Sequence, residues 1–365
     1  MNKIGLYGAG KNGQDLAGIL KEFDLLRCFI DGDEKKQKSG VEGVEVFGID
    51  DFIERYPDDK IVVASTQYDK QIVDELSERG KKNGEDFWNY YEFKGPILHR
   101  LLLDSFNVLY VELAQICVTE RCTLKCKKCA HACNLVPMNR EDMSLEEIKY
   151  SADCFFSIVD MVGEFVLIGG EPLLNKRLAD AVDYIGEKYR GKMLTFAITT
   201  NGTIIPDKRL KDSCYKYGVK IRVSDYSDTL PHLASKYKKL YEETQEMDVS
   251  IWKTNSYDAW FDYGFTETDN GDNPSILKSI FSDCKTPCRE IRGEKYYYCV
   301  MARCICDNMS ISVENHDYFE INKNTCKEDF LEFELYGPHK GYLDMCRYCR
   351  GASAINYRIP AAEQE

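Results

Sequence analysis

The sequence predicts an α/β fold in three parts, and three observations lead to this prediction. The chain of 365 residues begins with a short apolar strand, a glycine loop and a helix. Its central part alternates between apolar strands and amphipathic helices, as chains with a parallel sheet do. Its 16 cysteines gather mainly in two groups, at 117–133 and 284–349. We therefore divide the chain into segments 1–95, 105–280 and 281–365, which suits a length of two or three domains.

A glycine-rich loop follows the first predicted strand, at residues 3–7. The loop reads Gly8-Ala-Gly10-Lys-Asn-Gly13, a G-x-G-x-x-G pattern, and it leads into a helix with one apolar face. In this setting Gly8 permits a tight turn, and Gly10 lets a phosphate approach the backbone. Gly13 allows the helix to pack closely on the strand. The pattern predicts a nucleotide-binding turn.

The elements that follow complete a small domain. A second apolar run ends at Asp31, which stands 18 residues after Gly13, where a carboxylate can bind ribose hydroxyl groups. A third strand at 61–64 precedes a helix at 69–79. Segment 1–95 is therefore predicted to be Rossmann-like, and it resembles the small nucleotide-binding domains of some sugar-modifying enzymes. Two interpretations stay open: the domain binds a nucleotide, or its glycines only serve turn and packing and it docks a partner or a second subunit.

The central segment predicts a parallel partial barrel. A strand at 113–118 delivers the first cysteine group at its carboxyl end. Ser144 and Glu147 form a capping-box pattern at the start of a helix. The further predicted elements are strand 164–168, helix 176–189, strand 193–200, helix 207–216, strand 219–224, helix 231–243 and strand 248–252.

Three cysteines stand in a C-x3-C-x2-C run, at Cys122, Cys126 and Cys129. Three closely spaced thiolates can hold three irons of a 4Fe-4S cluster and leave the fourth iron open for chemistry. The alternatives are a zinc knuckle or a set of free thiols. The run resembles the signature of the radical S-adenosylmethionine (SAM) superfamily, and the central segment resembles the (β/α)6 partial barrel of these enzymes. The resemblance implies that the three thiolates hold the SAM-binding 4Fe-4S cluster.

A turn at the end of the next strand strengthens this resemblance. It reads Gly169-Gly170-Glu171-Pro172 and follows an apolar strand. Two glycines let a backbone come close to a ligand. In the superfamily this turn lies against the amino group of SAM through backbone carbonyl groups and the carboxylate. The resemblance therefore assigns all four residues to SAM binding.

Residues at the following strand ends are further candidates. Asn201 could bind the ribose or the carboxylate of SAM, or it could only serve the turn before a glycine. By resemblance, Ser224 and Arg222 are candidates for the ribose and carboxylate of SAM. One position departs from many relatives: Lys128 stands where they carry an aromatic residue near the adenine. Another residue is therefore expected to cover the adenine.

The second cysteine group resembles a different cluster domain. It contains Cys284, Cys288, Cys299, Cys304, Cys306, Cys326, Cys346 and Cys349. A cysteine before a strand-like run, a cysteine after it and a distant C-x2-C resemble the twitch and SPASM domains of radical SAM enzymes, which hold an auxiliary iron–sulfur cluster. The resemblance implies Cys288, Cys299, Cys346 and Cys349 as its ligands. One auxiliary cluster is preferred to two, and a zinc site is the alternative because four thiolates suit either metal.

The resemblance implies an enzyme that cleaves SAM reductively to a 5′-deoxyadenosyl radical, which abstracts a hydrogen atom from the substrate. The glycine-loop domain favours a carbohydrate or nucleotide-linked small molecule, such as a nucleotide-sugar, as the substrate of an oxidation or epimerisation. One alternative is a maturase that modifies a ribosomal peptide or a protein side chain, although these enzymes often begin with a winged-helix domain. Another is an iron–sulfur scaffold or redox sensor without catalysis. A flavodoxin- or ferredoxin-type protein is the expected electron donor.

Composition bounds the partners and the compartment. A formal net charge of −13 argues against nucleic-acid binding, which needs a basic surface. No apolar run approaches the roughly 20 residues of a membrane span. Met1 leads directly into the first strand without a signal-peptide pattern, so we expect a cytoplasmic protein whose cysteines bind metal. The tail from Pro360 is expected to be frayed.

Overall fold

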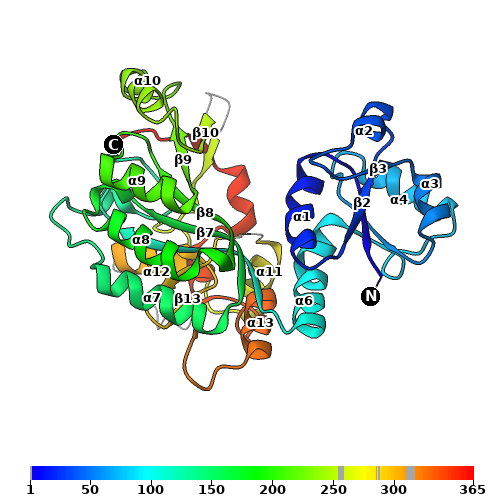
Figure 1. Cartoon of the computed structure of the whole chain (residues 1–365). Coiled ribbons are helices and arrows are strands. Elements are labelled where there is room, and N and C mark those ends of the chain that lie inside the picture. The colour runs from blue at the N-terminus through cyan, green and yellow to red at the C-terminus, as the bar shows by residue number, and fades with distance from the viewer. Residues whose placement is uncertain (1, 254–258, 285, 287, 310–316) are drawn as a thin grey trace. The chain divides into compact units, whose positions relative to one another are not determined.

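The computed structural model of the chain describes residues 2–253, 259–284, 286, 288–309 and 317–365 (Figure 1). The chain divides into two compact units, Met1–Asn107 and Val108–Glu365. The helix α6 (Leu98–Phe106) belongs to the first unit, so this unit extends past the predicted segment 1–95. The second unit contains both cysteine groups.

The first unit is built on a five-stranded parallel sheet. Its strands are β1 (Ile4–Tyr7), β2 (Leu26–Ile30), β3 (Val46–Phe47), β4 (Lys60–Val63) and β5 (Phe87–Asn89). Their order is β3-β2-β1-β4-β5, and every neighbouring pair is parallel. The helices are α1 (Lys11–Glu22), α2 (Glu34–Ser39), α3 (Ile49–Arg55), α4 (Asp69–Glu78), α5 (Tyr90–Glu92), the π-helix η1 (Phe93–Ile97) and α6. The strand order reverses between β1 and β4, as at the switch point of a doubly wound sheet.

Two glycines of the first loop meet steric demands at this switch point. Gly8 has a φ of 116°, a conformation that residues with a side chain rarely adopt. A Cβ atom on Gly13 would lie 2.1 Å from the carbonyl oxygen of Gly8, so α1 packs directly on the loop. No atom lies within 4 Å of a Cβ built on Gly10, which leaves open space above its backbone.

The second unit contains an eight-stranded sheet. Its strands in spatial order are β10 (Val249–Lys253), β9 (Val219–Asp225), β8 (Met193–Thr200), β7 (Met161–Gly169), β6 (Tyr110–Thr119), β12 (Glu290–Arg292), β13 (Lys295–Tyr297) and β14 (Tyr318–Glu320). The strands from β6 to β10 are parallel, and each predicted central strand overlaps one of them. Within the described residues five barrel strands are present instead of the six expected from (β/α)6. The other edge of β6 pairs with β12.

Helices pack on the parallel strands and carry the predicted periodicity. They are α7 (Leu145–Ile158), α8 (Leu178–Tyr189), α9 (Lys208–Tyr217) and α10 (Ala234–Glu243). The predicted capping box is confirmed, since the Ser144 side chain and the Glu147 side chain each bind the backbone N–H of the other residue. Phe155 on α7 packs against Phe165 on β7, with ring centroids 5.9 Å apart. This aromatic contact joins the helix layer to the sheet.

The remaining elements bring the end of the chain back to the barrel. They are β11 (Ala259–Phe261), α11 (Pro274–Asp283), α12 (Val300–Met309), α13 (Lys327–Tyr336) and β15 (Arg358–Pro360). β15 pairs antiparallel with β11. Ala361 and Ala362 are fully buried. The prediction of a frayed tail from Pro360 is therefore wrong. The tail is held by pairing with β11 and by burial of its alanines, and a strand of three residues is too short to be predicted from its sequence pattern.

Candidate functional site

The first cysteine group lies in the loop between β6 and α7, which we call the cysteine loop (residues 120–143). Lys128 and Ala132 have φ values of 54° and 51°, so the backbone of this loop passes through the left-handed region at two residues that are not glycine. The loop begins at the carboxyl end of β6, next to the end of β7. Cys122, Cys126 and Cys129 therefore meet the turns at the ends of the neighbouring strands.

The three thiols of the C-x3-C-x2-C run line one cavity of about 460 Å³, which we call the first cavity. Its other lining residues include Gly169, Gly170, Thr199, Thr200, Asn201 and Ser224. The structure thus brings together candidates from three strand ends, β7, β8 and β9, and the cysteine loop. The volume lies within the range of about 300–1,000 Å³ that small-molecule sites occupy.

The double glycine lets the end of β7 approach the cysteine loop. A Cβ atom on Gly169 would lie 2.3 Å from the carbonyl oxygen of Thr119. A Cβ atom on Gly170 would lie 2.4 Å from the carbonyl oxygen of Arg121 and 2.8 Å from the Cβ atom of Cys122. A side chain at Gly169 would push the turn away from Thr119 at the end of β6, and one at Gly170 would push it away from Arg121 and Cys122.

Glu171 of the same turn points away from the first cavity and is fully buried. Its carboxylate accepts hydrogen bonds from the Thr200 hydroxyl at 2.8 Å and from the backbone N–H groups of Asn201 at 2.8 Å and Leu173 at 3.1 Å. Burial raises the pKa of Glu171 to about 7, although these hydrogen bonds oppose the shift. Glu171 joins the turn after β7 to the turn after β8, and Pro172 is buried behind it.

The other predicted residues differ in how they relate to the first cavity. Asn201 and Ser224 line it. The Asn201 Nδ2 atom lies 3.5 Å from Cys122 Sγ and donates to the Thr123 hydroxyl at 3.0 Å. Arg222 does not line this cavity, because its guanidinium forms an ion pair of 2.5 Å with Glu164 on β7. The prediction for Arg222 is thus not supported by its position.

The thiols receive hydrogen bonds that suit metal-bound thiolates. Cys122 Sγ accepts from the Leu124 N–H at 3.4 Å, and Cys126 Sγ accepts from Gln364 Nε2 at 3.2 Å. Burial raises the pKa of Cys122 to about 11 and that of Cys126 to about 12. A hydrogen bond from the Cys133 thiol lowers the pKa of Cys129 to about 6. A bound cation would offset the cost of burying thiolates here, so this donor set fits an iron–sulfur cluster.

Aromatic side chains from two segments form a wall of the first cavity. Trp260 and Phe261 of β11 line it together with Tyr226 and Tyr263. The Tyr226 and Trp260 rings meet edge to face, with centroids 5.7 Å apart. The Lys128 ammonium forms ion pairs with Glu267 at 2.5 Å and Asp262 at 3.2 Å. This wall was not predicted, although aromatic residues recur in its segment, at Trp260, Phe261, Tyr263 and Phe265.

The second cysteine group surrounds another cavity of about 560 Å³, which we call the second cavity. All four predicted auxiliary ligands line it, and so does Cys284, which the prediction left out. The cysteines concerned are Cys284, Cys288, Cys299, Cys346 and Cys349. Burial raises the pKa of Cys346 to about 12 and that of Cys349 to about 11. Five thiols around the second cavity are suited to hold a second metal ion or cluster.

A single layer of residues separates the two cavities. Ala130, His131, Phe261 and Tyr263 line both of them. Burial lowers the pKa of His131 to about 4, and the positive charge of Arg303 adds to this shift while Glu120 opposes it. His131 is thus held as a neutral imidazole between two groups of thiols.

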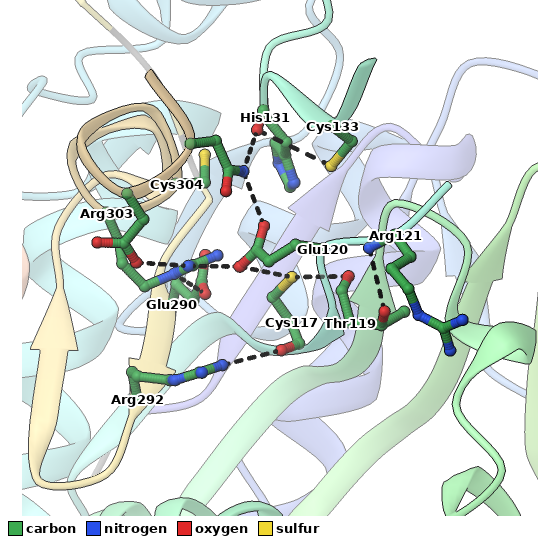
Figure 2. A network of polar contacts seen from close by, with 12 residues as sticks. Cys117, Thr119, Glu120, Arg121, His131, Cys133, Glu290, Arg292, Arg303 and Cys304 are labelled. Carbon is green, nitrogen blue, oxygen red and sulfur yellow. Dashed lines mark hydrogen bonds and ion pairs between the residues drawn. The ribbon is translucent and has the colours of Figure 1, made fainter. Parts of the chain in front are cut away.

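A buried ionic network joins α12 to the cysteine loop (Figure 2). The Arg303 guanidinium forms ion pairs with Glu120 at 2.6 Å and with Glu290, and both carboxylates are buried. Asn308 on the same helix donates to Glu120 at 2.9 Å and to the carbonyl oxygen of His131 at 2.8 Å. Because α12 begins immediately after Cys299, the network ties the second cavity to the loop of the first.

The glycine loop of the first unit lines a separate cavity of about 550 Å³. Gly8, Gly10 and Asp31 line it, whereas Gly13 lies beneath the loop. The Asp31 carboxylate accepts from the Ala9 N–H at 3.0 Å and forms an ion pair of 2.8 Å with Lys36. Burial would raise the pKa of Asp31, but the hydrogen bonds from Lys36, Asp33 and Ala9 outweigh it and lower this pKa.

As far as the structure describes them, the cysteine groups do not form a compact site for a single metal ion. In the described part of the chain, no group of three or more His, Cys, Asp or Glu side chains converges as the ligands of one metal ion do. The cysteines of both groups instead line spaces of several hundred Å³. Among the helices within the described ranges, none combines the length and the apolar composition that crossing a membrane requires.

Comparison with known families agrees with the geometry of the first cavity. Residues 116–220 match the family described as the radical SAM superfamily, and residues 1–84 match the family described as C2185-like, N-terminal. The first match includes the three cysteines, the Gly169–Gly170 turn and Asn201. It places the central part of this chain in the radical SAM superfamily.

Curated relatives match over limited segments. An uncharacterized protein of Methanocaldococcus jannaschii is 33% identical over 117 residues, which cover 31% of this chain and 39% of that protein. A GTP 3′,8-cyclase of Ectopseudomonas mendocina is 34% identical over 104 residues, which cover 28% of this chain and 29% of the relative. A GTP 3′,8-cyclase of Rhizobium etli is 30% identical over 140 residues, or 38% of each chain. The chain thus spans less than half the length of these relatives.

Solved structures show a distant similarity. BtrN in complex with AdoMet and 2-DOIA is 17% identical, with a TM-score of 0.40, and the match covers 68% of this chain and 98% of that chain. Streptococcus suis SuiB bound to the precursor peptide SuiA is 15% identical, with a TM-score of 0.37, and covers 80% and 83% respectively.

Proposed function

We propose that this chain is a radical SAM enzyme that acts on a carbohydrate or nucleotide-linked small molecule, by oxidation or epimerisation at a carbon atom. One observation carries the proposal: the three thiols of the C-x3-C-x2-C run share one cavity with the double-glycine turn and Asn201. When bound, a 4Fe-4S cluster and SAM supply one-electron cleavage of SAM to a 5′-deoxyadenosyl radical, which abstracts a hydrogen atom. A flavodoxin- or ferredoxin-type protein would deliver the electron.

The residues of the first cavity would bind and orient these groups. Cys122, Cys126 and Cys129 would hold the cluster, and the backbone of the Gly169–Gly170 turn would face SAM. Asn201 and Ser224 offer an amide and a hydroxyl at the cavity wall. The aromatic wall of β11 would cover the adenine, in place of the aromatic residue that Lys128 replaces. These side chains would also keep water away from the reacting carbon.

The second cavity would hold an auxiliary iron–sulfur cluster. Cys288, Cys299, Cys346 and Cys349 would be its ligands. Oxidation of an alcohol or amine by hydrogen abstraction leaves one further electron and one proton to be removed, and a redox group in the second cavity would accept the electron. The single layer of residues between the cavities favours a short path for that electron.

The first unit supports a small substrate more than a peptide. Its five parallel strands and doubly wound order differ from the winged-helix domain with which peptide maturases often begin. We infer that Gly8, Gly10, Gly13 and Asp31 shape a nucleotide site, which could bind the nucleotide of a nucleotide-sugar. The substrate named for two relatives, GTP, is itself a nucleotide.

Iron content tests the cluster assignment. Anaerobic reconstitution of the wild-type chain should give about eight irons if both clusters are four-iron cubes. Replacing Cys122, Cys126 and Cys129 with alanine should reduce this to about four and abolish formation of 5′-deoxyadenosine. The exposed Cys326→Ala variant is the matched control and should keep both values. An unchanged iron content in the triple variant would refute the assignment.

Isotope transfer tests the substrate class. The reduced enzyme would be incubated with SAM and with nucleotide-sugars deuterated at single carbons. Deuterium in 5′-deoxyadenosine, measured by mass spectrometry, would identify both the substrate and the carbon that is attacked. Transfer from a precursor peptide, with none from any sugar or nucleotide, would instead favour the maturase alternative.

A further inference from the structure

Residues 358–365, which we call the C-terminal strap, contact two walls of the first cavity. β15 pairs with β11, and this strand presents Trp260 and Phe261 to the cavity. Ala361 and Ala362 are fully buried after β15, and Ala362 has a left-handed φ of 56°. A non-glycine residue in this conformation costs about 1 kcal/mol, so the surrounding contacts must hold the turn in place. The turn directs the last residues to the cysteine loop.

Backbone hydrogen bonds fix the strap against the loop. The Lys127 N–H donates to the carbonyl oxygen of Glu363 at 2.7 Å, and the Glu365 N–H donates to the carbonyl oxygen of Lys125 at 2.9 Å. An ion pair of 2.6 Å between Lys127 and Glu363 lies outside them, in solvent. These bonds form an antiparallel bridge in which Gln364 stands directly opposite Cys126.

Three hydrogen bonds determine the orientation of the Gln364 amide. Its Oε1 atom accepts from the Lys125 N–H at 2.7 Å, so the oxygen faces the backbone. The Nε2 atom donates one hydrogen to the carbonyl oxygen of Ala362 at 2.6 Å and the other to Cys126 Sγ at 3.2 Å. A flipped amide would place donor against donor and acceptor against acceptor, so the N–H···S contact follows from the network.

We propose that Gln364 is a positioning residue of the cysteine site, whose amide N–H binds the Cys126 thiolate and tunes the cluster held there. This inference rests on the proposed function, because it assigns Cys126 to a cluster. The other two thiols receive their donors from the cysteine loop and the turn after β8, whereas Cys126 receives this donor from residue 364, 238 residues further along the chain. Cys126 is 7% exposed, so water cannot readily replace the amide.

The expected effect is on the reduction potential. Hydrogen bonds to cluster sulfurs stabilise the added negative charge of the reduced state, and their loss makes a cluster harder to reduce. Gln364→Leu removes the donor at similar size. Gln364→Glu keeps an oxygen for the Lys125 N–H but replaces the donor with a negative charge. Both variants should shift the midpoint potential to more negative values, and Gln364→Glu should shift it further.

The parent protein for this test is the full chain with Cys346→Ala and Cys349→Ala, so that only the cluster of the first cavity is reconstituted. An EPR-monitored redox titration then measures the midpoint potential of that one cluster. Glu363→Gln is the matched control, because it removes the solvent-exposed ion pair and keeps the backbone bonds, and its potential should equal that of the parent. Equal potentials in the parent and in Gln364→Leu would overturn this proposal and leave the proposed function standing. A parent that binds no cluster would overturn both.

Alkylation of the cluster-free chain provides a second readout. The amide donor lowers the pKa of Cys126, and only the thiolate is alkylated. Cys126 should therefore react with iodoacetamide several-fold more slowly in Gln364→Leu than in the wild type, as measured by peptide mass spectrometry. The buried Cys117 of β6 is the internal reference, and its rate should stay unchanged if the fold is intact. An unchanged Cys126 rate in Gln364→Leu would contradict the proposal even if that variant failed to bind iron.

Discussion

At the residue scale, the first cavity depends on side chains that are absent as much as on those present. Gly169 and Gly170 bring the end of β7 against the cysteine loop at distances that exclude a Cβ atom. Glu171, the next residue, is buried behind them and bonds to Thr200 and Asn201. The Gly169-Gly170-Glu171 sequence therefore has two structural roles. The glycines allow the cysteine loop to pack closely, and the glutamate links the turn after β7 to the turn after β8.

Gly170→Ala should disturb the cysteine loop. The new methyl group would lie within 3 Å of Arg121 and Cys122, and overpacking of this kind costs about 1–3 kcal/mol. We expect a lower free energy of unfolding and a loss of reconstituted iron from the first site. Gly191→Ala is the control, since no atom lies within 4 Å of its Cβ position. Equal iron content and stability in the two variants would contradict the steric argument.

Glu171 should make stability depend on pH. Its pKa is about 7 in the folded chain against 4.5 ordinarily, so between these values the folded state binds a proton that the unfolded state has lost. The contribution of this group to the unfolding free energy therefore falls as pH rises from 4.5 to 7, by up to about 3 kcal/mol. Glu171→Gln removes this dependence, because the amide imitates the protonated acid.

The measurement is urea denaturation of the cluster-free wild type and variant at about pH 5 and about pH 7.5. The wild type should lose stability relative to Glu171→Gln as the pH rises. The exposed Glu187→Gln variant should instead follow the wild type at both pH values. Parallel curves for wild type and Glu171→Gln would show that Glu171 keeps its ordinary pKa.

At the element scale, α12 connects the two cysteine cavities. It starts after Cys299 of the second cavity, and its Arg303 and Asn308 bind Glu120 and His131 in the cysteine loop of the first (Figure 2). The sequence interpretation missed this link, because a cationic residue in a helix near the end of a chain usually faces solvent. The helix and the cysteine loop are also far apart in the sequence, since 183 residues separate Arg303 from Glu120.

Arg303→Met should destabilise the second unit strongly. It leaves the carboxylates of Glu120 and Glu290 buried without their cation, and removing one partner of a buried ion pair costs about 3–5 kcal/mol. Chemical denaturation followed by circular dichroism measures the change. Arg209→Met, which removes a solvent-exposed ion pair, should cost no more than about 1 kcal/mol. Similar losses in both variants would contradict a buried network.

At the scale of the whole molecule, local patterns predicted the elements well and the long-range pairings poorly. Strands such as β8 were predictable because an apolar run between turn residues identifies a buried parallel strand. The cysteine run was predictable because its ligands lie close together in sequence. The pairing of β12 with β6 and the return of residues 358–365 involve partners far apart in the chain, which local periodicity cannot relate.

Removal of the second cysteine set should halve the iron content and spare the first cluster. The variant Cys346→Ala with Cys349→Ala should bind about four irons and still convert SAM to 5′-deoxyadenosine, because the first cavity keeps its three thiols. Iron analysis and chromatography of the products measure both quantities. Retention of about eight irons would show that these two thiols are not cluster ligands.

The strap of residues 358–365 also constrains when the site can mature. Cys126 leaves the ribosome 238 residues before the amide that binds its sulfur. At a translation rate of roughly 5–20 residues per second, this interval lasts about 12–48 s. During that time the cysteine loop lacks its partner strand and cannot reach its final shape. Delivery of iron and sulfide to a finished binding site must therefore follow the synthesis of residues 358–365.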